Sequence, residues 1–299
     1  MIHTLTLNPA LDHTVRAESF TLGVTNRVAE EKLTVGGKGI NVSLMLSSLG
    51  AESIAHGFLG GEVGVLIEQK ARAAGLVTKF IFTAGESRIN CKIKSDEETE
   101  LNGKGVTVTP EAYAELLKNL SSLQAGDFLV LAGSVPQGLT KTVYAELMQA
   151  LKGKGIRFVV DTTGEALRSA LPHRPFLVKP NAAELGELFG VEITGKERAV
   201  FYAKKLLELG AERVLVSLGG EGAVFVSETG EEYQTTAPQG KVVDTVGSGD
   251  SVVAGFLWSI AQGRDERTAF LTGVAAGSAS AFTDGFATKT EVENLLKTL

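Results

Sequence analysis

A glycine-rich turn runs directly into an apolar helical pattern in the stretch Asp244-Thr-Val-Gly-Ser-Gly-Asp250-Ser-Val-Val-Ala-Gly-Phe256. Glycines let such a turn adopt positive φ and leave its amides uncovered. The start of a helix adds unpaired N–H donors and the positive end of the helix dipole. We therefore expect an anion site at Gly247, Ser248 and Gly249, with the carboxylate of Asp250 beside it.

This pairing of donors and carboxylate suits phosphoryl transfer to a hydroxyl group. The donors stabilise charge on the moving phosphoryl group, and the carboxylate accepts the hydroxyl proton. The alternative is that Asp250 is a first-turn residue that only complements the helix dipole. A second glycine turn, Val35-Gly-Gly-Lys-Gly-Ile-Asn-Val42, also leads into a helical pattern and favours the functional interpretation.

Short apolar runs alternate with amphipathic segments along most of the chain. This alternation predicts an α/β fold, a doubly wound and mostly parallel sheet with helices on both faces. Ligands of such sheets bind at the carboxyl ends of the strands. The expected strands are Ile2–Leu7, Ile54–Leu59, Phe128–Ala132, Phe158–Val160, Phe176–Val178 and Val214–Leu218, and the expected helices include Glu62–Ala74, Pro110–Ser121, Lys141–Lys152 and Lys196–Leu209.

Two stretches, His13–Thr34 and Arg88–Leu101, carry strand-like alternation and no helical pattern. They predict a small separate β-sheet; the alternative is two edge hairpins with polar outer faces. In the second stretch Ile89, Cys91 and Ile93 alternate with polar residues. If the polar face covers a site, the apolar face needs another partner, and a second copy of the chain is the simplest one.

Six motifs in a fixed order resemble those of the ribokinase-like, PfkB-type carbohydrate kinases, and the resemblance covers nearly the whole chain. It implies one kinase domain over residues 1–299, with a lid formed by about 13–35 and 87–105. The motifs are Thr6-Leu-Asn-Pro-Ala-Leu-Asp12, Gly36-Gly-Lys-Gly-Ile-Asn41, Ser87-Arg-Ile-Asn90, Lys179-Pro-Asn-Ala-Ala-Glu184, Ser217-Leu-Gly-Gly220 and the Asp250 segment.

The resemblance implies ATP-dependent phosphorylation of a sugar phosphate, with Asp250 as the general base. Within the family, Thr6–Ala10 and Glu98–Gly103 are most similar to enzymes that phosphorylate D-fructose 1-phosphate at O6. A kinase for tagatose 6-phosphate is the alternative substrate assignment. A catalytically silent sugar-phosphate sensor on the same fold is the alternative of a different class.

The same resemblance assigns the other site residues. Substrate binding is expected at Asp12, Arg27, Gly37, Lys38, Asn41 and Arg88, with the three cations anchoring the phosphate that the sugar already carries. ATP binding is expected at Lys179, Asn181, Ser217, Gly219, Gly222 and Gly249. Mg²⁺ is expected at Glu184 and Asn181, through water; by spacing alone, the same pair fits a helix N-terminus equally well.

The composition of the chain limits the kinds of molecule that it is expected to bind. The formal net charge of −6 and the lack of a basic run argue against nucleic acid and anionic membranes as partners. The single cysteine, Cys91, excludes an internal disulfide. No signal peptide is apparent and no apolar run reaches the ~20 residues of a membrane span, so a cytoplasmic location is expected. A homodimer through the lid is the remaining expectation.

Overall fold

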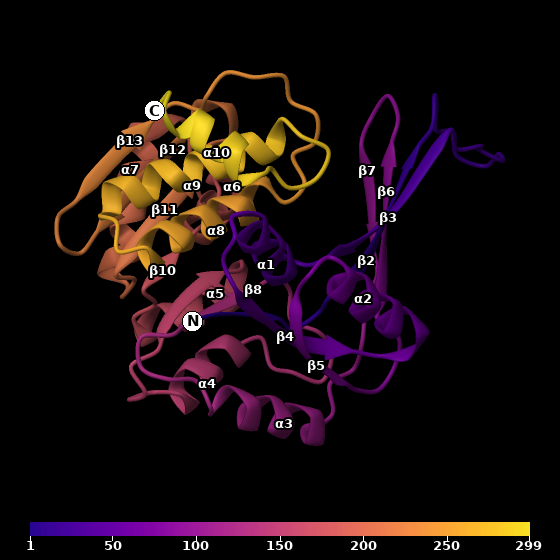
Figure 1. The fold of residues 1–299 in the computed structure, drawn as a ribbon, viewed down its shortest axis with the longest axis horizontal. Helices are drawn as coiled ribbons and strands as arrows, with labels where there is room; N and C mark the ends of the chain where they lie inside the picture. Colours follow the sequence, from indigo (N-terminus) through magenta and orange to yellow (C-terminus); the bar gives the residue numbers. More distant parts are fainter.

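The computed structural model describes all 299 residues and is built around a nine-stranded sheet (Figure 1). The strand order is β13-β12-β11-β10-β9-β8-β1-β4-β5. All neighbours are parallel except the pairs β11–β12 and β12–β13. The strands are β1 (Ile2–Thr6), β4 (Ser53–Leu59), β5 (Val77–Phe82), β8 (Phe128–Ala132), β9 (Arg157–Asp161), β10 (Leu177–Val178), β11 (Arg213–Ser217), β12 (Ala223–Ser227) and β13 (Glu232–Thr235).

Helices cover both faces of this sheet. One face carries α1 (Lys38–Ser48), α8 (Ser248–Ala261), α9 (Glu266–Ala281) and α10 (Lys289–Leu296). The other carries α3 (Pro110–Leu120), α4 (Val143–Ala150), α5 (Gly164–Ala170), α6 (Ala182–Phe189) and α7 (Gly195–Glu208). Helix α2 (Gly61–Ala73) packs against the β5 edge of the sheet. The predicted doubly wound fold is confirmed.

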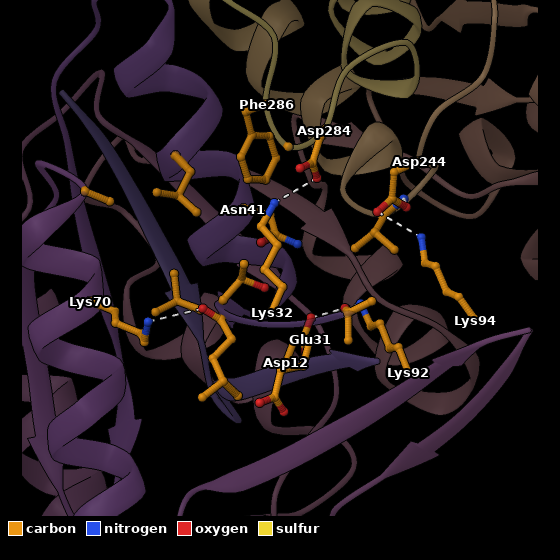
Figure 2. A pocket seen from close by; sticks show the side chains of 18 of the residues that line it. Asp12, Glu31, Lys32, Asn41, Lys70, Lys92, Lys94, Asp244, Asp284 and Phe286 are labelled. Carbon is orange, nitrogen blue, oxygen red and sulfur yellow. Dashed lines mark hydrogen bonds and ion pairs between the residues drawn. The ribbon is translucent and has the colours of Figure 1, made fainter. Parts of the chain in front are cut away.

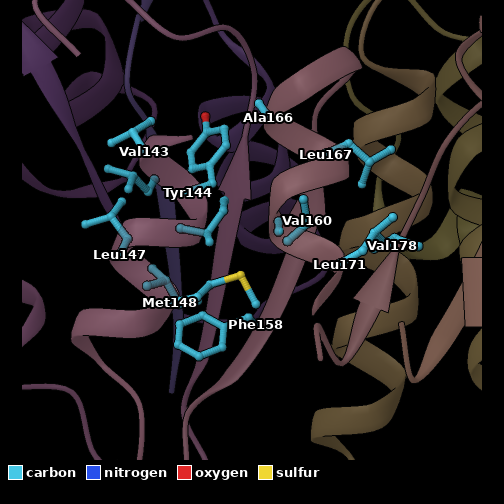
Figure 3. Close-up of a cluster of buried hydrophobic side chains, with 14 of the residues drawn as sticks. Val143, Tyr144, Leu147, Met148, Phe158, Val160, Ala166, Leu167, Leu171 and Val178 are labelled. Carbon is cyan, nitrogen blue, oxygen red and sulfur yellow. The ribbon is translucent and has the colours of Figure 1, made fainter. Parts of the chain in front are cut away.

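The core explains why the predicted runs form buried strands. Parallel strands covered on both faces read as continuous apolar runs, and all five residues of β8 are buried. Figure 3 shows part of the core under α4 and α5, where Tyr144, Met148 and Phe158 pack against Val160. The buried hydroxyl of Tyr144 donates to the carbonyl oxygen of Ala132, so this polar atom is satisfied.

A four-stranded sheet, which we call the lid, projects from the body (Figure 1). Its order is β3-β2-β6-β7, with the central pair β2–β6 parallel. The strands are β2 (Ala10–Arg16), β3 (Glu30–Gly36), β6 (Arg88–Lys94) and β7 (Thr99–Asn102). The two stretches with strand-like alternation therefore pair with each other in one sheet.

The small residues near the C-terminus serve close helix packing. A Cβ on Gly255 of α8 would lie 2.7 Å from the Cβ of Ala276 on α9, so the two helices meet almost backbone to backbone. Gly277 on α9 makes the same kind of approach to Val252. None of the helices combines the length and the apolar character that a bilayer span requires.

Candidate active site

Asp250 lies in the first turn of α8, facing the first turn of α1. Its carboxylate is 7% exposed, and Oδ2 accepts a 2.7 Å hydrogen bond from Nδ2 of Asn41. Burial, followed by the negative charge of Asp161, raises the pKa of Asp250 to about 7. A carboxylate with a pKa near the working pH is suited to general-base chemistry.

The turn before α8 leaves amide donors free. Gly247 has φ 78°, and a Cβ there would lie 2.9 Å from the ring of Phe286. The amides of Gly247, Gly249 and Asp250 donate to no backbone carbonyl, whereas the amide of Ser248 donates to Thr245 at 3.2 Å. The hydroxyl of Ser248 is buried without a partner. The backbone amides that are free to bind an anion are therefore those of Gly247, Gly249 and Asp250. Ser248 can contribute its hydroxyl group, because its amide already donates to Thr245.

A buried carboxylate, Asp161 at the end of β9, joins two lysines. Nζ of Lys38 lies 2.7 Å from Oδ1 of Asp161, and Nζ of Lys179 lies 3.4 Å from Oδ2. Burial alone would raise the pKa of Asp161, but Lys179 and Lys38 outweigh it and lower that pKa. Asp161 is therefore ionised and fixes both ammonium groups beside the glycine turn.

The side chain of Lys38 lies elsewhere than expected. It was expected among the anchors of the sugar's phosphate, but its ammonium group also lies 3.2 Å from Oε1 of Glu184. Burial would lower the pKa of Lys38, but Asp161 and Glu184 outweigh it and raise that pKa above its usual value. Because Lys38 begins α1, its side chain crosses to the carboxyl end of β9 and not to the lid.

Asn181 and Glu184 form a capping box at the start of α6. The amide of Glu184 donates to Oδ1 of Asn181, and the amide of Asn181 donates to Oε2 of Glu184. The structure therefore confirms the alternative interpretation of this pair, in which Asn181 and Glu184 cap the N-terminus of a helix. No group of three or more His, Cys, Asp or Glu side chains could hold a metal. Any cation here would rest on Glu184 together with water and ligand oxygens.

Two cavities meet at the Asp250–Asn41 pair. The first, which we call the turn cavity, has a volume of about 620 Å³ and includes Asp250 in its wall. It also brings together every residue expected to bind ATP, as well as Glu184 and Lys38. These are Lys179, Asn181, Ser217, Gly219, Gly222 and Gly249.

The second, which we call the lid cavity, has a volume of about 1010 Å³ and includes Asn41 in its wall (Figure 2). Asp12 lies under the lid, where its carboxylate accepts hydrogen bonds from Nδ2 of Asn90 and Nζ of Lys92, each at 2.9 Å. Across the cavity Lys94 of the lid pairs with Asp244, 3.0 Å away. The carboxylate of Asp12 and the amide of Asn41 thus face one space, as sugar hydroxyls require.

The remaining expected residues do not line either cavity. Nε of Arg88 donates to the carbonyl oxygen of Asn8, and burial lowers the pKa of Arg88, partly opposed by Asp12. Arg27 is exposed in the segment between β2 and β3, so nothing within one chain brings it to the cavities. Gly37 has φ 117°, and a Cβ there would lie 2.6 Å from Thr6, which accounts for this glycine by backbone geometry.

Comparison with known proteins identifies the family. Residues 5–292 match the pfkB family of carbohydrate kinases. The chain belongs to this family. It is 46% identical over 297 residues to the 1-phosphofructokinase of Bacillus subtilis (strain 168), covering 99% of this chain and 97% of that protein.

A second relative of this kinase is the tagatose-6-phosphate kinase of Staphylococcus epidermidis strain RP62A, 37% identical over 262 residues, with 85% of this chain and 84% of that protein covered. Among solved structures, phosphofructokinase-2 from Escherichia coli in complex with substrates and products superimposes with a TM-score of 0.94. The two are 29% identical, with 100% of this chain and 99% of that one covered.

Sequence reasoning missed four charged residues of the kinase site: Asp161, Lys92, Lys94 and Asp244. A signal existed for the first three. Asp161 follows the predicted strand Phe158–Val160 directly, at the carboxyl end where ligands bind. Lys92 and Lys94 continue the polar alternation of Arg88 and Asn90.

Proposed function

We propose that this kinase transfers the γ-phosphoryl group of ATP to O6 of D-fructose 1-phosphate, giving fructose 1,6-bisphosphate and ADP. The observation that carries the proposal is the hydrogen-bonded pair Asn41–Asp250, which stands between the turn cavity and the lid cavity. The sugar phosphate takes the lid cavity and ATP takes the turn cavity. The choice of sugar is supported by the 46% identity to a 1-phosphofructokinase.

Each residue has a role that follows from its position. Asp12 and Asn41 accept from and donate to the sugar hydroxyls and point O6 toward Asp250. Asp250 removes the O6 proton, which its raised pKa favours. The free amides of the glycine turn and the hydroxyl of Ser248 stabilise charge on the transferring group.

Lys38 and Lys179, held by Asp161, add positive charge on the ATP side. This role replaces the one expected for Lys38 at the sugar's phosphate. Arg88 was also expected at that phosphate, but it lies beside Asp12 without lining either cavity.

The protein offers few ligands for Mg²⁺ at this site. Glu184 is the one carboxylate on the wall of the turn cavity besides Asp250, and both its oxygens already have partners. In phosphoryl-transfer sites Mg²⁺ keeps several waters and binds one or two carboxylates plus substrate phosphates. Glu184, with Asn181 through water, would hold it here. When bound, the ion neutralises charge on the phosphates.

A side-by-side substrate assay tests the proposed function. Purified protein is given ATP and Mg²⁺ with fructose 1-phosphate, fructose 6-phosphate or tagatose 6-phosphate, and ADP release is followed. We expect the highest kcat/KM with fructose 1-phosphate. A preference for tagatose 6-phosphate would instead favour the alternative assignment, a tagatose-6-phosphate kinase like the relative from Staphylococcus epidermidis. Absence of turnover with every sugar phosphate would favour the catalytically silent sensor.

We also propose a homodimer through the outer face of the lid. Leu33, His13, Cys91 and Leu101 form one row across its four strands, and Leu33 and Leu101 are exposed. Ile89 is exposed on the same face, whereas Ile93 is only 7% exposed, so Ile93 is buried within one chain and does not itself need a second copy. The exposed apolar set of the lid and its β2–β3 loop is Phe20, Leu22, Val24, Val28, Leu33, Ile89 and Leu101. A set of this kind marks an interaction surface.

Leu101→Asp should therefore turn a dimer into a monomer. A charge buried in a two-fold apolar interface must be desolvated there. Sedimentation velocity over a dilution series measures the association. Val65→Asp, at an exposed position of α2 on the body, is the matched control and should stay dimeric. A parent protein that remains monomeric at high concentration would exclude the lid dimer.

A further inference from the structure

The inner face of the lid carries a ladder of cations that no expected role explains. In the pairing of β2 with β6, Asp12 lies opposite Asn90, Thr14 opposite Lys92, and Arg16 opposite Lys94. Each step of two residues moves the side chain about 7 Å along the strand. Lys92 and Lys94 therefore follow Asp12 outward, on the face that lines the lid cavity (Figure 2).

These two lysines are more buried than Lys32 and Arg16, the exposed cations of the cavity. The side chains of Lys92 and Lys94 are 8% and 18% exposed, whereas that of Lys32 is 50% exposed. A charge partly withdrawn from water is less screened and attracts an anion more strongly. Their burial thus makes Lys92 and Lys94 stronger anion partners than Lys32 and Arg16.

The carboxylates that now pair with the two lysines can release them. Asp12 keeps the hydrogen bond from Asn90 when Lys92 turns away. Asp244 likewise keeps the hydrogen bond from the amide of Val246 when Lys94 turns away. An incoming anion can therefore exchange with either carboxylate without leaving that carboxylate unpartnered.

We propose that Lys92 and Lys94 hold the phosphate group that the sugar substrate already carries. The proposal rests on the proposed function. A sugar at Asp12 and Asn41 directs O6 to Asp250, and a phosphate on the far side of the ring lies one step further along the lid, at the level of Lys92. Two ammonium groups match the charge of about −1.5 to −2 on a phosphate monoester. Arg88 lies one step on the other side of Asp12, opposite Ala10.

The alternative is that Lys92 only holds Asp12 in place. In that case its loss would harm every sugar equally, phosphorylated or not. A phosphate-binding lysine instead matters only when the phosphate is present. The two roles are separated by comparing fructose 1-phosphate with unphosphorylated fructose as acceptors.

The test uses Lys92→Met and Lys94→Met, with Lys70→Met as the matched control. Lys70 lines the same cavity but comes from α2 and donates to the carbonyl oxygen of Leu33. Each lid variant should raise KM for fructose 1-phosphate by roughly 10- to 150-fold, the loss of a hydrogen bond between charged groups. KM for ATP should stay at the parent value, and kcat/KM for fructose should fall far less than kcat/KM for fructose 1-phosphate. Inorganic phosphate should inhibit both lid variants more weakly than the parent and the Lys70 variant.

Two results would overturn the proposal. The first is an unchanged KM for fructose 1-phosphate in both lid variants, which would leave the phosphate to Arg88. The second is an equal loss with fructose and fructose 1-phosphate, which would make Lys92 a support for Asp12. Lys94→Met, at the less buried position, keeps the test available if Lys92→Met does not fold. If the parent phosphorylates no sugar phosphate, the proposed function fails, while calorimetric binding of fructose 1-phosphate and of inorganic phosphate to the same variants still decides the role of the lysines.

Discussion

Asp250→Asn is expected to lower kcat by roughly 10²- to 10⁴-fold, the usual cost of losing a general base. Asparagine keeps the shape of the side chain and an oxygen for Asn41, but it cannot take the O6 proton. KM values for sugar phosphate and ATP should change little, because neither cavity changes shape. Steady-state kinetics on the folded variant measures both quantities.

The pH profile provides an independent check on Asp250. Because its pKa is raised to about 7, the carboxylate is ionised above that pH and protonated below it. In the parent, kcat/KM should fall by about tenfold per pH unit on the acid side. The variant should lack this acid limb. Retention of the limb in Asp250→Asn would assign it to another group.

Asp265→Asn is a matched control for this substitution. Asp265 is the N-cap of α9, the next helix along the chain, and its side chain accepts from the amide of Thr268. Asparagine and aspartate cap helices about equally well. The control should keep both the parent rate and the acid limb. A comparable loss of kcat in this control would indicate a general sensitivity to charge in this region and not base catalysis.

The fold was predictable because its signals are local. A run such as Phe128–Ala132 is buried on both faces and needs no distant partner to be recognised as a strand. The Gly247 turn and the helix after it are likewise encoded in consecutive residues. The capping box of Asn181 and Glu184 is also local, and sequence left it as an equal alternative to a metal site.

The charged network of the site was less predictable because its members meet only in three dimensions. Lys38 has two carboxylates within reach, Asp161 and Glu184, more than 120 positions away along the chain. Sequence alone could not show which strand ends would face α1. The same holds for Lys94 and Asp244, which come together across the lid cavity. Family resemblance named the residues expected to contact ligands but not the partners that fix their orientation.

Asp161→Asn is expected to have the second largest effect, and the effect is on stability. The substitution removes the charge of a carboxylate that is 1% exposed and leaves Lys179, 4% exposed, without a partner. Removal of one member of a buried ion pair costs about 3–5 kcal/mol. Lys38 keeps Glu184, so we expect a loss near the lower end, about 3 kcal/mol. Urea unfolding, with the midpoint and slope both fitted, measures the free energy of unfolding.

The same substitution should also move the acid limb of kcat/KM to lower pH. Burial continues to raise the pKa of Asp250, but the negative charge of Asp161 is gone and the two lysines that favour the ionised form remain. Asp127→Asn is the control. Asp127 directly precedes β8 and pairs with the N-terminal ammonium, at the end of the sheet opposite to the active site. It should leave the limb in place. If the limb of Asp161→Asn also stays near pH 7, burial alone sets the pKa of Asp250, and Asp161 serves only to hold the lysines.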